Sequence, residues 1–240
     1  MSRPPASEAE RSAAEPGSRF DFGQIAEAYD RWYDTRAGRV YDLLERRAVS
    51  KALPPAEPGA RLLDVGCGTG HWSAFFSKQG YAVTGIDITR EMIGVARGKG
   101  IGQTSFEVAD AHALPFEDGC FDVTAAITTL EFVRDAEAVL REMVRCTASP
   151  GGIVLLGVLN SLAAMNIKRR KAHKPPYADA RFFCPEDIER LLEPHGSVQV
   201  RVTTFAPRWK AALFLAPLID FIGRLRHGRR GAFIVGRVVR

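Results

Sequence analysis

Short apolar runs alternate with amphipathic stretches along the middle of the chain, from about residue 61 to residue 158. The runs are rich in Val, Ile and Leu and end at Gly, Asp or Pro, which is typical of strands buried on both faces. The stretches between them carry apolar residues three or four positions apart, as helices do. This alternation predicts an α/β fold with a doubly wound, seven-stranded and mostly parallel sheet.

The same pattern gives approximate bounds for each element. We expect strands over residues 62–65, 81–87, 105–110, 120–127, 153–158, 198–205 and 232–239. We expect helices over residues 71–78, 89–99, 136–146 and 185–192. Residues 209–225 are strongly apolar but contain Lys210, Pro217 and Asp220. Their uninterrupted apolar run is well below the ~20 residues that span a bilayer, so a helical connection is expected there.

Two segments precede the α/β domain, which is expected to cover residues 59–240. Residues 1–18 are rich in Ser, Ala, Pro, Glu and Arg and lack the apolar core of a secretory signal, so we expect a disordered leader. Residues 19–58 are expected to form an N-terminal helical cap. It would hold an amphipathic helix from Phe20, with Asp21 as its N-cap, and a second helix over residues 40–53.

Composition narrows the class of protein. With 240 residues, 46% hydrophobic and 25% charged, the chain is typical of a soluble globular protein. Its four cysteines stand far apart with no C-x-x-C pair, which argues against a zinc site and a disulfide framework. We therefore expect no metal and a cytoplasmic location. Much of the formal charge of +5 comes from arginines in the C-terminal third.

The most informative stretch is the turn after the first strand, Asp64-Val65-Gly66-Cys67-Gly68-Thr69-Gly70. Glycines let the backbone adopt conformations closed to other residues and let a ligand approach closely. The spacing G-x-G-x-G differs from the G-x-G-x-x-G of nicotinamide-cofactor domains, and a carboxylate at Asp64 would repel a pyrophosphate. A ligand with an ammonium or sulfonium charge suits it better. A nicotinamide site and a purely structural turn remain as alternatives.

This motif resembles the cofactor motif of class I S-adenosylmethionine-dependent methyltransferases. The chain is similar, over residues 59–157, to the subgroup that includes the ubiquinone and menaquinone methyltransferases. The resemblance implies methyl transfer with S-adenosyl-L-methionine as the cofactor. It also implies that Asp87 binds the ribose, that Ile88 lies against adenine, and that Asp110 and Ala111 bind the adenine edge. The cofactor contacts that it implies are Asp64, Gly66, Cys67, Gly68, Gly70, Asp87, Ile88, Asp110, Ala111, Ile127 and Tyr29.

The positions of Asp87 and Asp110 along the chain support their role in ligand binding independently of the resemblance. Each ends a predicted strand, and open parallel sheets bind ligands outside the carboxyl ends of their strands. Asp87 lies seventeen residues beyond Gly70, close to the ~20-residue spacing at which such folds present an acid to ribose hydroxyls. Its alternative role is the N-cap of the helix over residues 89–99.

The catalytic residue is less defined. Glu131 is the candidate for a group that acts on an acceptor proton, and its alternative role is a solvated residue at a helix start. Many members of the resembling family carry a histidine near this point, where this chain has Phe132. Two roles are open for Tyr29, Trp32 and Tyr33, which either pack on the domain or close over the cofactor.

We expect a small, mainly apolar acceptor. The segments expected to wall its pocket are the aromatic helix, the loop after Leu159 and residues 209–225. The basic run 168–174 is expected to be a solvated face or to receive an anion, and with residues 209–230 it is the candidate for peripheral membrane contact. A nucleic-acid (RNA) methyltransferase is disfavoured because no Asn/Asp-Pro-Pro-Tyr/Phe motif follows the fourth strand. A non-catalytic cofactor-binding protein is the other alternative, and the oligomeric state stays open.

Overall fold

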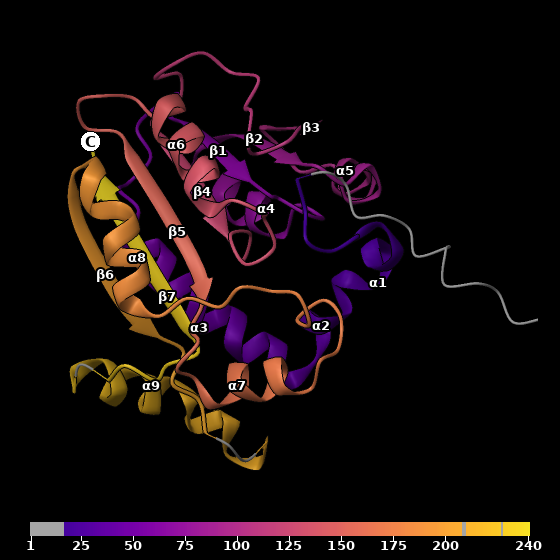
Figure 1. Ribbon diagram of the computed structural model, residues 1–240, viewed down its shortest axis with the longest axis vertical. Coiled ribbons are helices and arrows are strands. Elements are labelled where there is room, and N and C mark those ends of the chain that lie inside the picture. Colours follow the sequence, from indigo (N-terminus) through magenta and orange to yellow (C-terminus); the bar gives the residue numbers. More distant parts are fainter. Residues whose placement is uncertain (1–16, 208–209, 227) are drawn as a thin grey trace, which may run out of the picture.

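A seven-stranded sheet forms the centre of the computed structural model, which describes residues 17–207, 210–226 and 228–240 (Figure 1). The strand order is β3-β2-β1-β4-β5-β7-β6, and β7 alone runs antiparallel to its neighbours. The predicted seven-stranded, mostly parallel sheet is therefore confirmed. The strands are β1 (Arg61–Val65), β2 (Ala82–Asp87), β3 (Thr104–Val108), β4 (Val123–Ile127), β5 (Ile153–Leu159), β6 (Ser197–Thr203) and β7 (Phe233–Val239).

Helices cover both faces of this sheet. On one face, α3 (Arg36–Ala52) and α4 (His71–Lys78) pack on apolar side chains of β1, β4, β5 and β7. On the other, α6 (Ala136–Cys146) and α8 (Pro185–Leu192) pack on the alternate side chains of the same strands. Helix α5 (Arg90–Gly98) lies against β2 and β3. Because β4 and β5 are buried along their whole length, both faces of the sheet are core.

The N-terminal cap departs from the prediction of one amphipathic helix. The segment from Phe20 is instead a 3₁₀ turn, Gly23–Ile25, followed by α1 (Ala26–Tyr29) and α2 (Arg31–Asp34). The break falls at Asp30, whose carboxylate accepts a hydrogen bond from the Thr69 hydroxyl and pairs with Lys99. These contacts pin the break to the glycine-rich turn, so tertiary contacts override the local helical pattern.

Two boundaries of the N-terminal segments also differ from the sequence pattern. Helix α3 begins four residues before the predicted residue 40, because the Thr35 hydroxyl caps it by accepting from the N–H of Gly38. Residues 1–16 lie outside the described part of the chain. Gly17 and Ser18, which were assigned to the leader, are buried, and Ser18 pairs with Val133 after β4.

The C-terminal third adds two helices at one end of the molecule (Figure 1). Part of the basic run lies on α7 (Ala164–Lys171). The predicted apolar connection forms a 3₁₀ helix, Lys210–Leu215, and α9 (Ala216–Leu225), while Trp209 lies outside the described residues. In the parts of the chain that the structure describes, no helix combines the length and apolar character needed to cross a bilayer.

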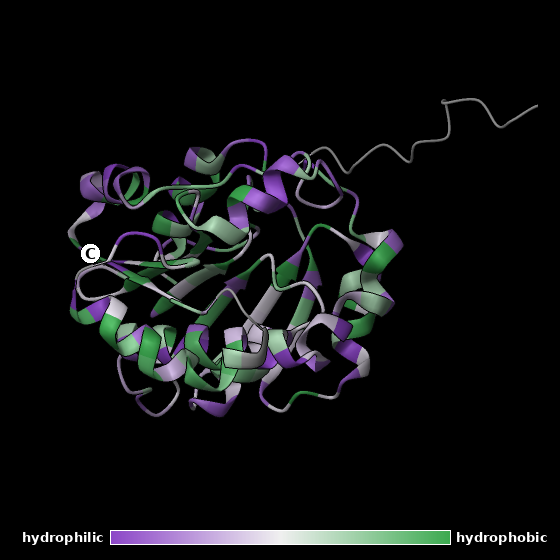
Figure 2. Cartoon of the chain, turned by 90° about the horizontal axis from the view of Figure 1, so that it is seen from below, coloured by the Kyte–Doolittle hydropathy of each residue, from purple (hydrophilic) through white to green (hydrophobic). Residues whose placement is uncertain are grey.

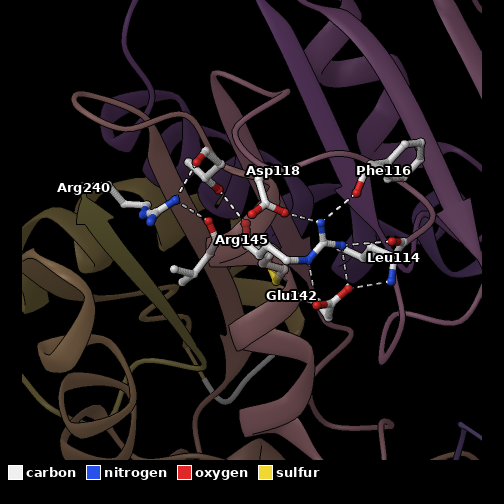
Figure 3. Close-up of polar contacts among 9 residues, drawn as sticks. Leu114, Phe116, Asp118, Glu142, Arg145 and Arg240 are labelled. Atoms are coloured by element: carbon white, nitrogen blue, oxygen red, sulfur yellow. Dashed lines mark hydrogen bonds and ion pairs between the residues drawn. The ribbon is translucent and has the colours of Figure 1, made fainter.

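A polar clamp fixes the loop after β3 to α6 (Figure 3). All five N–H donors of the Arg145 guanidinium are used: they bind the Glu142 and Asp118 carboxylates and the carbonyls of Leu114 and Phe116, at 2.7–3.0 Å. Glu142 also accepts from the N–H of Leu114. These contacts lower the pKa of Glu142 and raise that of Arg145. The loop that follows Asp110 is thereby held in one conformation.

Candidate functional site

The carboxyl ends of β1 to β4 surround a cavity with about 620 Å³ of empty space, its open mouth included. From β1 the chain continues to β2 and β3 on one side of β1, and it then returns to β4 on the other side. The cavity therefore lies at the point where the strand order reverses. Such switch points are where open α/β sheets bind ligands. We call this space the strand-end cavity. Its lining residues are Gly17, Ser18, Phe22, Tyr29, Gly66, Gly68, Ile86, Asp87, Ile88, Thr89, Met92, Ala109, Asp110, Ala111, Thr128, Thr129, Phe132 and Val133.

The glycine-rich turn forms the floor of this cavity. Gly66 and Gly68 have φ values of +70° and +52°, in the left-handed region that favours glycine. A Cβ on Gly66 would approach the Thr129 side chain to 2.2 Å, so this glycine is required for packing. At Gly68 no atom lies within 4 Å of the place that a Cβ would occupy. Gly68 therefore presents bare backbone to open space inside the cavity.

Asp87 joins the turn to the start of α5. One carboxylate oxygen accepts from the N–H of Gly68 at 2.9 Å, and the other accepts from the N–H of Thr89 at 2.8 Å. Burial raises the pKa of Asp87, and these two hydrogen bonds oppose that rise. Thr89 is the N-cap residue of α5, although its side chain makes no capping bond. Asp87 is therefore not the N-cap of α5; it lines the cavity and joins the glycine-rich turn to the residue that caps the helix.

A second carboxylate, Asp110, is held by a histidine. The Nδ1 atom of His112 lies 2.7 Å from the Asp110 carboxylate, and Nε2 of the same ring accepts from the N–H of Asp135 at 3.2 Å. His112 is therefore a donor at Nδ1 and an acceptor at Nε2. Across the cavity mouth, a Cβ on Gly17 would meet the Asp110 carboxylate at 2.6 Å. The N-terminal segment consequently passes directly over Asp110.

Seven of the predicted cofactor contacts line the strand-end cavity, but four do not. Asp64 is buried behind the turn, where it accepts from the Ser73 hydroxyl at 2.6 Å, and burial raises its pKa to about 7. Cys67 turns its side chain into an apolar cluster around Phe106. Gly70 precedes α4 as its N-cap, and Ile127 packs in the core. The residues that face away are Asp64, Cys67, Gly70 and Ile127.

A second cavity adjoins the first, and we call it the aromatic chamber. The two share Phe22, Tyr29, Thr128 and Phe132. Thr128 has a φ of +52°, an uncommon conformation for a residue with a Cβ, at the junction between the two spaces. The other residues that line the chamber are Trp32, Tyr33, Tyr41, Glu45, Leu159, Met165, Arg169, Pro176, Tyr177 and Ala232.

Of the three segments expected to wall an acceptor pocket, two line the aromatic chamber. The aromatic segment supplies Tyr29, Trp32 and Tyr33, and the stretch that begins at Leu159 supplies residues up to Tyr177. The described residues of the third segment, 210–225, do not line the chamber, and Trp209 lies outside the described part of the chain. Phe132, which takes the place of the family's histidine, lies at the junction.

Hydroxyl groups and two charged side chains, Glu45 and Arg169, stand among the aromatic rings of the chamber. The Arg169 guanidinium lies 4.7 Å from the ring centre of Tyr177 and 5.7 Å from that of Trp32. Burial, with smaller contributions from neighbouring carboxylates, raises the pKa of Tyr29, so its hydroxyl stays protonated. Burial also raises the pKa of Glu45 to about 8. Sequence reasoning missed Glu45, because nothing in the pattern of α3 distinguishes it from a solvated helix residue.

Glu131 does not occupy the position expected of it. Its side chain is 0% exposed, so the alternative of a solvated helix-start residue is wrong. One carboxyl oxygen binds the N–H of Leu159, the other has no hydrogen-bond partner, and the residue lines neither space. Burial raises its pKa to about 8. In the described ranges no group of three or more His, Cys, Asp or Glu residues is arranged to hold a metal ion.

Relatives in sequence share the central part of this domain. The family described as a methyltransferase domain matches residues 63–156. A malonyl-[acyl-carrier protein] O-methyltransferase of Pectobacterium atrosepticum is 33% identical over 138 residues, or 58% of this chain. That stretch is 51% of the relative, so the chain spans about half its length. An uncharacterized protein of Methanocaldococcus jannaschii is 28% identical over 76% of this chain and 83% of its own.

Among solved structures, a SAM-dependent methyltransferase from Thermotoga maritima has a TM-score of 0.68 at 24% identity. It covers 91% of this chain and 97% of its own, so the likeness includes the N-terminal cap and the last strands as well as the matched domain. The strand order, the antiparallel β7 and the glycine turn at the switch point agree with these matches. Residues 63–156 are thus a methyltransferase domain, and the chain has the fold of the class I S-adenosylmethionine-dependent methyltransferases.

Proposed function

We propose that this protein transfers a methyl group from S-adenosylmethionine to a small, mainly apolar acceptor held in the aromatic chamber. The observation that carries the proposal is the junction at Phe22, Tyr29, Thr128 and Phe132, where the strand-end cavity meets the chamber. A donor in one space and an acceptor in the other would meet there. The aromatic walls suit an uncharged, apolar body.

The strand-end cavity fits an adenosine-containing cofactor. Gly68 offers bare backbone for close approach, and the Asp87 carboxylate retains lone pairs for two ribose hydroxyls after binding two N–H groups. Asp110 would accept from the adenine amino group, and the N–H of Ala111 would donate to the adenine ring beside it. We assign cofactor binding to Gly66, Gly68, Asp87, Ile88, Asp110, Ala111 and Tyr29. S-adenosylmethionine supplies an electrophilic methyl group on its sulfonium.

The chain contributes orientation and exclusion of water to this reaction. Phe22, Tyr29 and Phe132 surround the junction with three rings that contact edge to face, at centroid distances of 5.0 and 6.2 Å from Phe22. Reactants held in line reach effective molarities of ~10⁵–10⁸ M. The protonated Tyr29 hydroxyl can donate a hydrogen bond to either reactant but cannot act as a base.

Glu45 is the side chain best suited to take a proton from the acceptor. Glu45 is the only carboxylate among the described residues that line the chamber. Its pKa of about 8 lies close to neutral pH. A general base is most effective when its pKa is near the operating pH. Turnover on a hydroxyl acceptor should therefore rise with pH around 8, as Glu45 ionises. Glu45→Gln should abolish this rise of turnover with pH and lower turnover by about 10²-fold or more, without weakening cofactor binding.

Glu27→Gln, at an exposed position on α1, is the control and should keep the pH dependence of the wild type. If turnover of Glu45→Gln still rises with pH, Glu45 is not the general base.

The proposed function is tested with cell extract, purified protein and methyl-labelled cofactor. We expect one low-mass metabolite to gain the label while S-adenosylhomocysteine is released. Label that disappears when the extract is treated with ribonuclease would instead assign the protein to RNA methylation. Cofactor binding without release of S-adenosylhomocysteine in any extract would assign it to the non-catalytic binding proteins.

A further inference from the structure

Helix α9 and the 3₁₀ helix before it present an apolar face to solvent. The large apolar side chains exposed there are Phe214, Leu215, Leu218, Phe221, Ile222 and Leu225. Phe214 and Leu225 are 71% and 68% exposed. Their helical spacing brings Leu218, Phe221 and Leu225 to one side of α9. Single exposed apolar residues are common, but a contiguous group of this kind marks an interaction surface.

A buried carboxylate fixes this orientation. Asp220 is 3% exposed and accepts hydrogen bonds from the Thr203 hydroxyl and the N–H groups of Thr204 and Phe205, at 2.7–3.1 Å. Arg224 pairs with its other oxygen at 2.8 Å. Turning the helix to bury its apolar side would leave Asp220 and two N–H groups without partners, at a large cost. These hydrogen bonds between α9 and residues 203–205 therefore hold the apolar face outward.

Positive charge surrounds the same end of the molecule. Lys168, Arg170 and Lys171 are exposed on α7, and Arg226 and Arg230 are exposed after α9. Asp220 is the one acid in the sequence after residue 193, and it is buried. Helices α7 and α9 lie at one end of the ribbon, and Figure 2 looks at that end, where hydrophobic segments alternate with hydrophilic ones on the helices nearest the viewer (Figures 1 and 2). The surface is thus apolar with a basic surround.

A wide groove separates α7 from α9. Its walls include Ile167 and Lys168 from α7, Ile219 from α9 and Arg230, and it holds about 2110 Å³ of space open to solvent. It shares Tyr41, Met165 and Ala232 with the aromatic chamber. The groove, the chamber and the strand-end cavity are therefore neighbours in a row, and the groove opens beside the apolar face.

We propose that α7 and α9 dock on an anionic lipid bilayer, and that the groove between them admits an amphiphilic acceptor from that bilayer to the chamber. Apolar side chains would enter the boundary of the acyl chains while the basic residues meet anionic headgroups. A second copy of the chain is a poorer occupant, because pairing the two apolar faces would bring like charges together. The identity of the acceptor rests on the proposed methyl transfer, whereas the docking does not.

The test is sedimentation of the full chain with lipid vesicles. We expect binding to vesicles of phosphatidylcholine and phosphatidylglycerol that weakens with added salt, and little binding to phosphatidylcholine alone. The double variant Leu218→Gln/Phe221→Gln should bind about a hundredfold more weakly, since each side chain loses the burial of an apolar group. Arg226→Gln/Arg230→Gln, which removes two exposed charges and no core contact, should bind about 20-fold more weakly. Leu43→Gln, at an exposed leucine on α3, should bind as the wild type does.

Calorimetric binding of S-adenosylmethionine to the same samples separates the two proposals. If the protein binds the cofactor but not the vesicles, the docking proposal is overturned and the proposed function stands. If it binds the vesicles but not the cofactor, the proposed function is overturned and the docking stands. Light scattering is measured in parallel on the wild type and on Leu218→Gln/Phe221→Gln. If the wild type is a dimer and the double variant is a monomer, the apolar face binds a second copy of the chain, and the membrane proposal is overturned.

Discussion

Replacing the buried carboxyl of Glu131 should change how the stability of the protein depends on pH. Burial raises the pKa of Glu131 from its ordinary value of 4.5 to about 8, so the folded protein keeps this proton up to about pH 8. Between these values the unfolded chain releases the proton and the folded protein keeps it, so rising pH favours unfolding. At about 1.4 kcal/mol per pH unit, the free energy of unfolding loses roughly 2.5 kcal/mol through this group between pH 5 and pH 7. The loss levels off above pH 8.

Glu131→Gln removes this ionisation and keeps an oxygen for the N–H of Leu159. At pH 5 we expect the variant to be less stable by about 1–3 kcal/mol, because its amide N–H groups take the place of an oxygen that has no partner. The difference between variant and wild type should then shift in favour of the variant by about 2–3 kcal/mol on going to pH 7. Other titrating groups are present in both proteins and cancel in the difference.

Urea unfolding followed by circular dichroism at pH 5, 6, 7 and 8 measures this difference. The exposed Glu117 provides the matched control, and Glu117→Gln should give a curve parallel to that of the wild type. A Glu131→Gln curve that also runs parallel would refute the reasoning, since it would mean that Glu131 ionises alike in the folded and unfolded states.

Three further substitutions test the site and its support. Asp87→Ala should weaken calorimetric binding of S-adenosylmethionine by about 1.5–3 kcal/mol, and an unchanged dissociation constant would reject the ribose assignment. Gly68→Val should fold but lose cofactor binding. Gly100 has a similar φ of +58° and equally open space, but lies outside the cavity, so Gly100→Val should keep cofactor binding. If the two variants bind the cofactor equally well, the turn has a structural role only. Arg145→Met should lower the free energy of unfolding by about 2 kcal/mol and the melting temperature by about 4–8 °C. Arg141 is exposed on the same helix, so Arg141→Met should change neither. Equal melting temperatures of the two variants would show that the polar clamp does not stabilise the protein.

The sequence by itself determined the framework of the protein. Helices α4, α6 and α8 begin and end at the predicted residues, because apolar period and capping residues act within a few positions of one another. The parallel strands of an α/β sheet meet at one edge, so Asp87 and Asp110 could be brought to the same cavity from their positions alone. Gly66 and Gly68 followed from the motif.

The tertiary structure decided which side each residue turns and what covers it. Asp64 and Cys67 belong to the motif but face away from the cavity, because Ser73 and the apolar cluster around Phe106 bind their side chains. Glu131 is buried and Glu45 lines the chamber, although the local pattern of each allows a solvated helix position.

Helix α9 gives the plainest case. Its apolar period alone favours burial of that side, yet the hydrogen bonds that Asp220 accepts from Thr203, Thr204 and Phe205 turn it outward. Periodicity records which residues share a face, whereas the partner of that face is set by contacts between residues far apart in the chain.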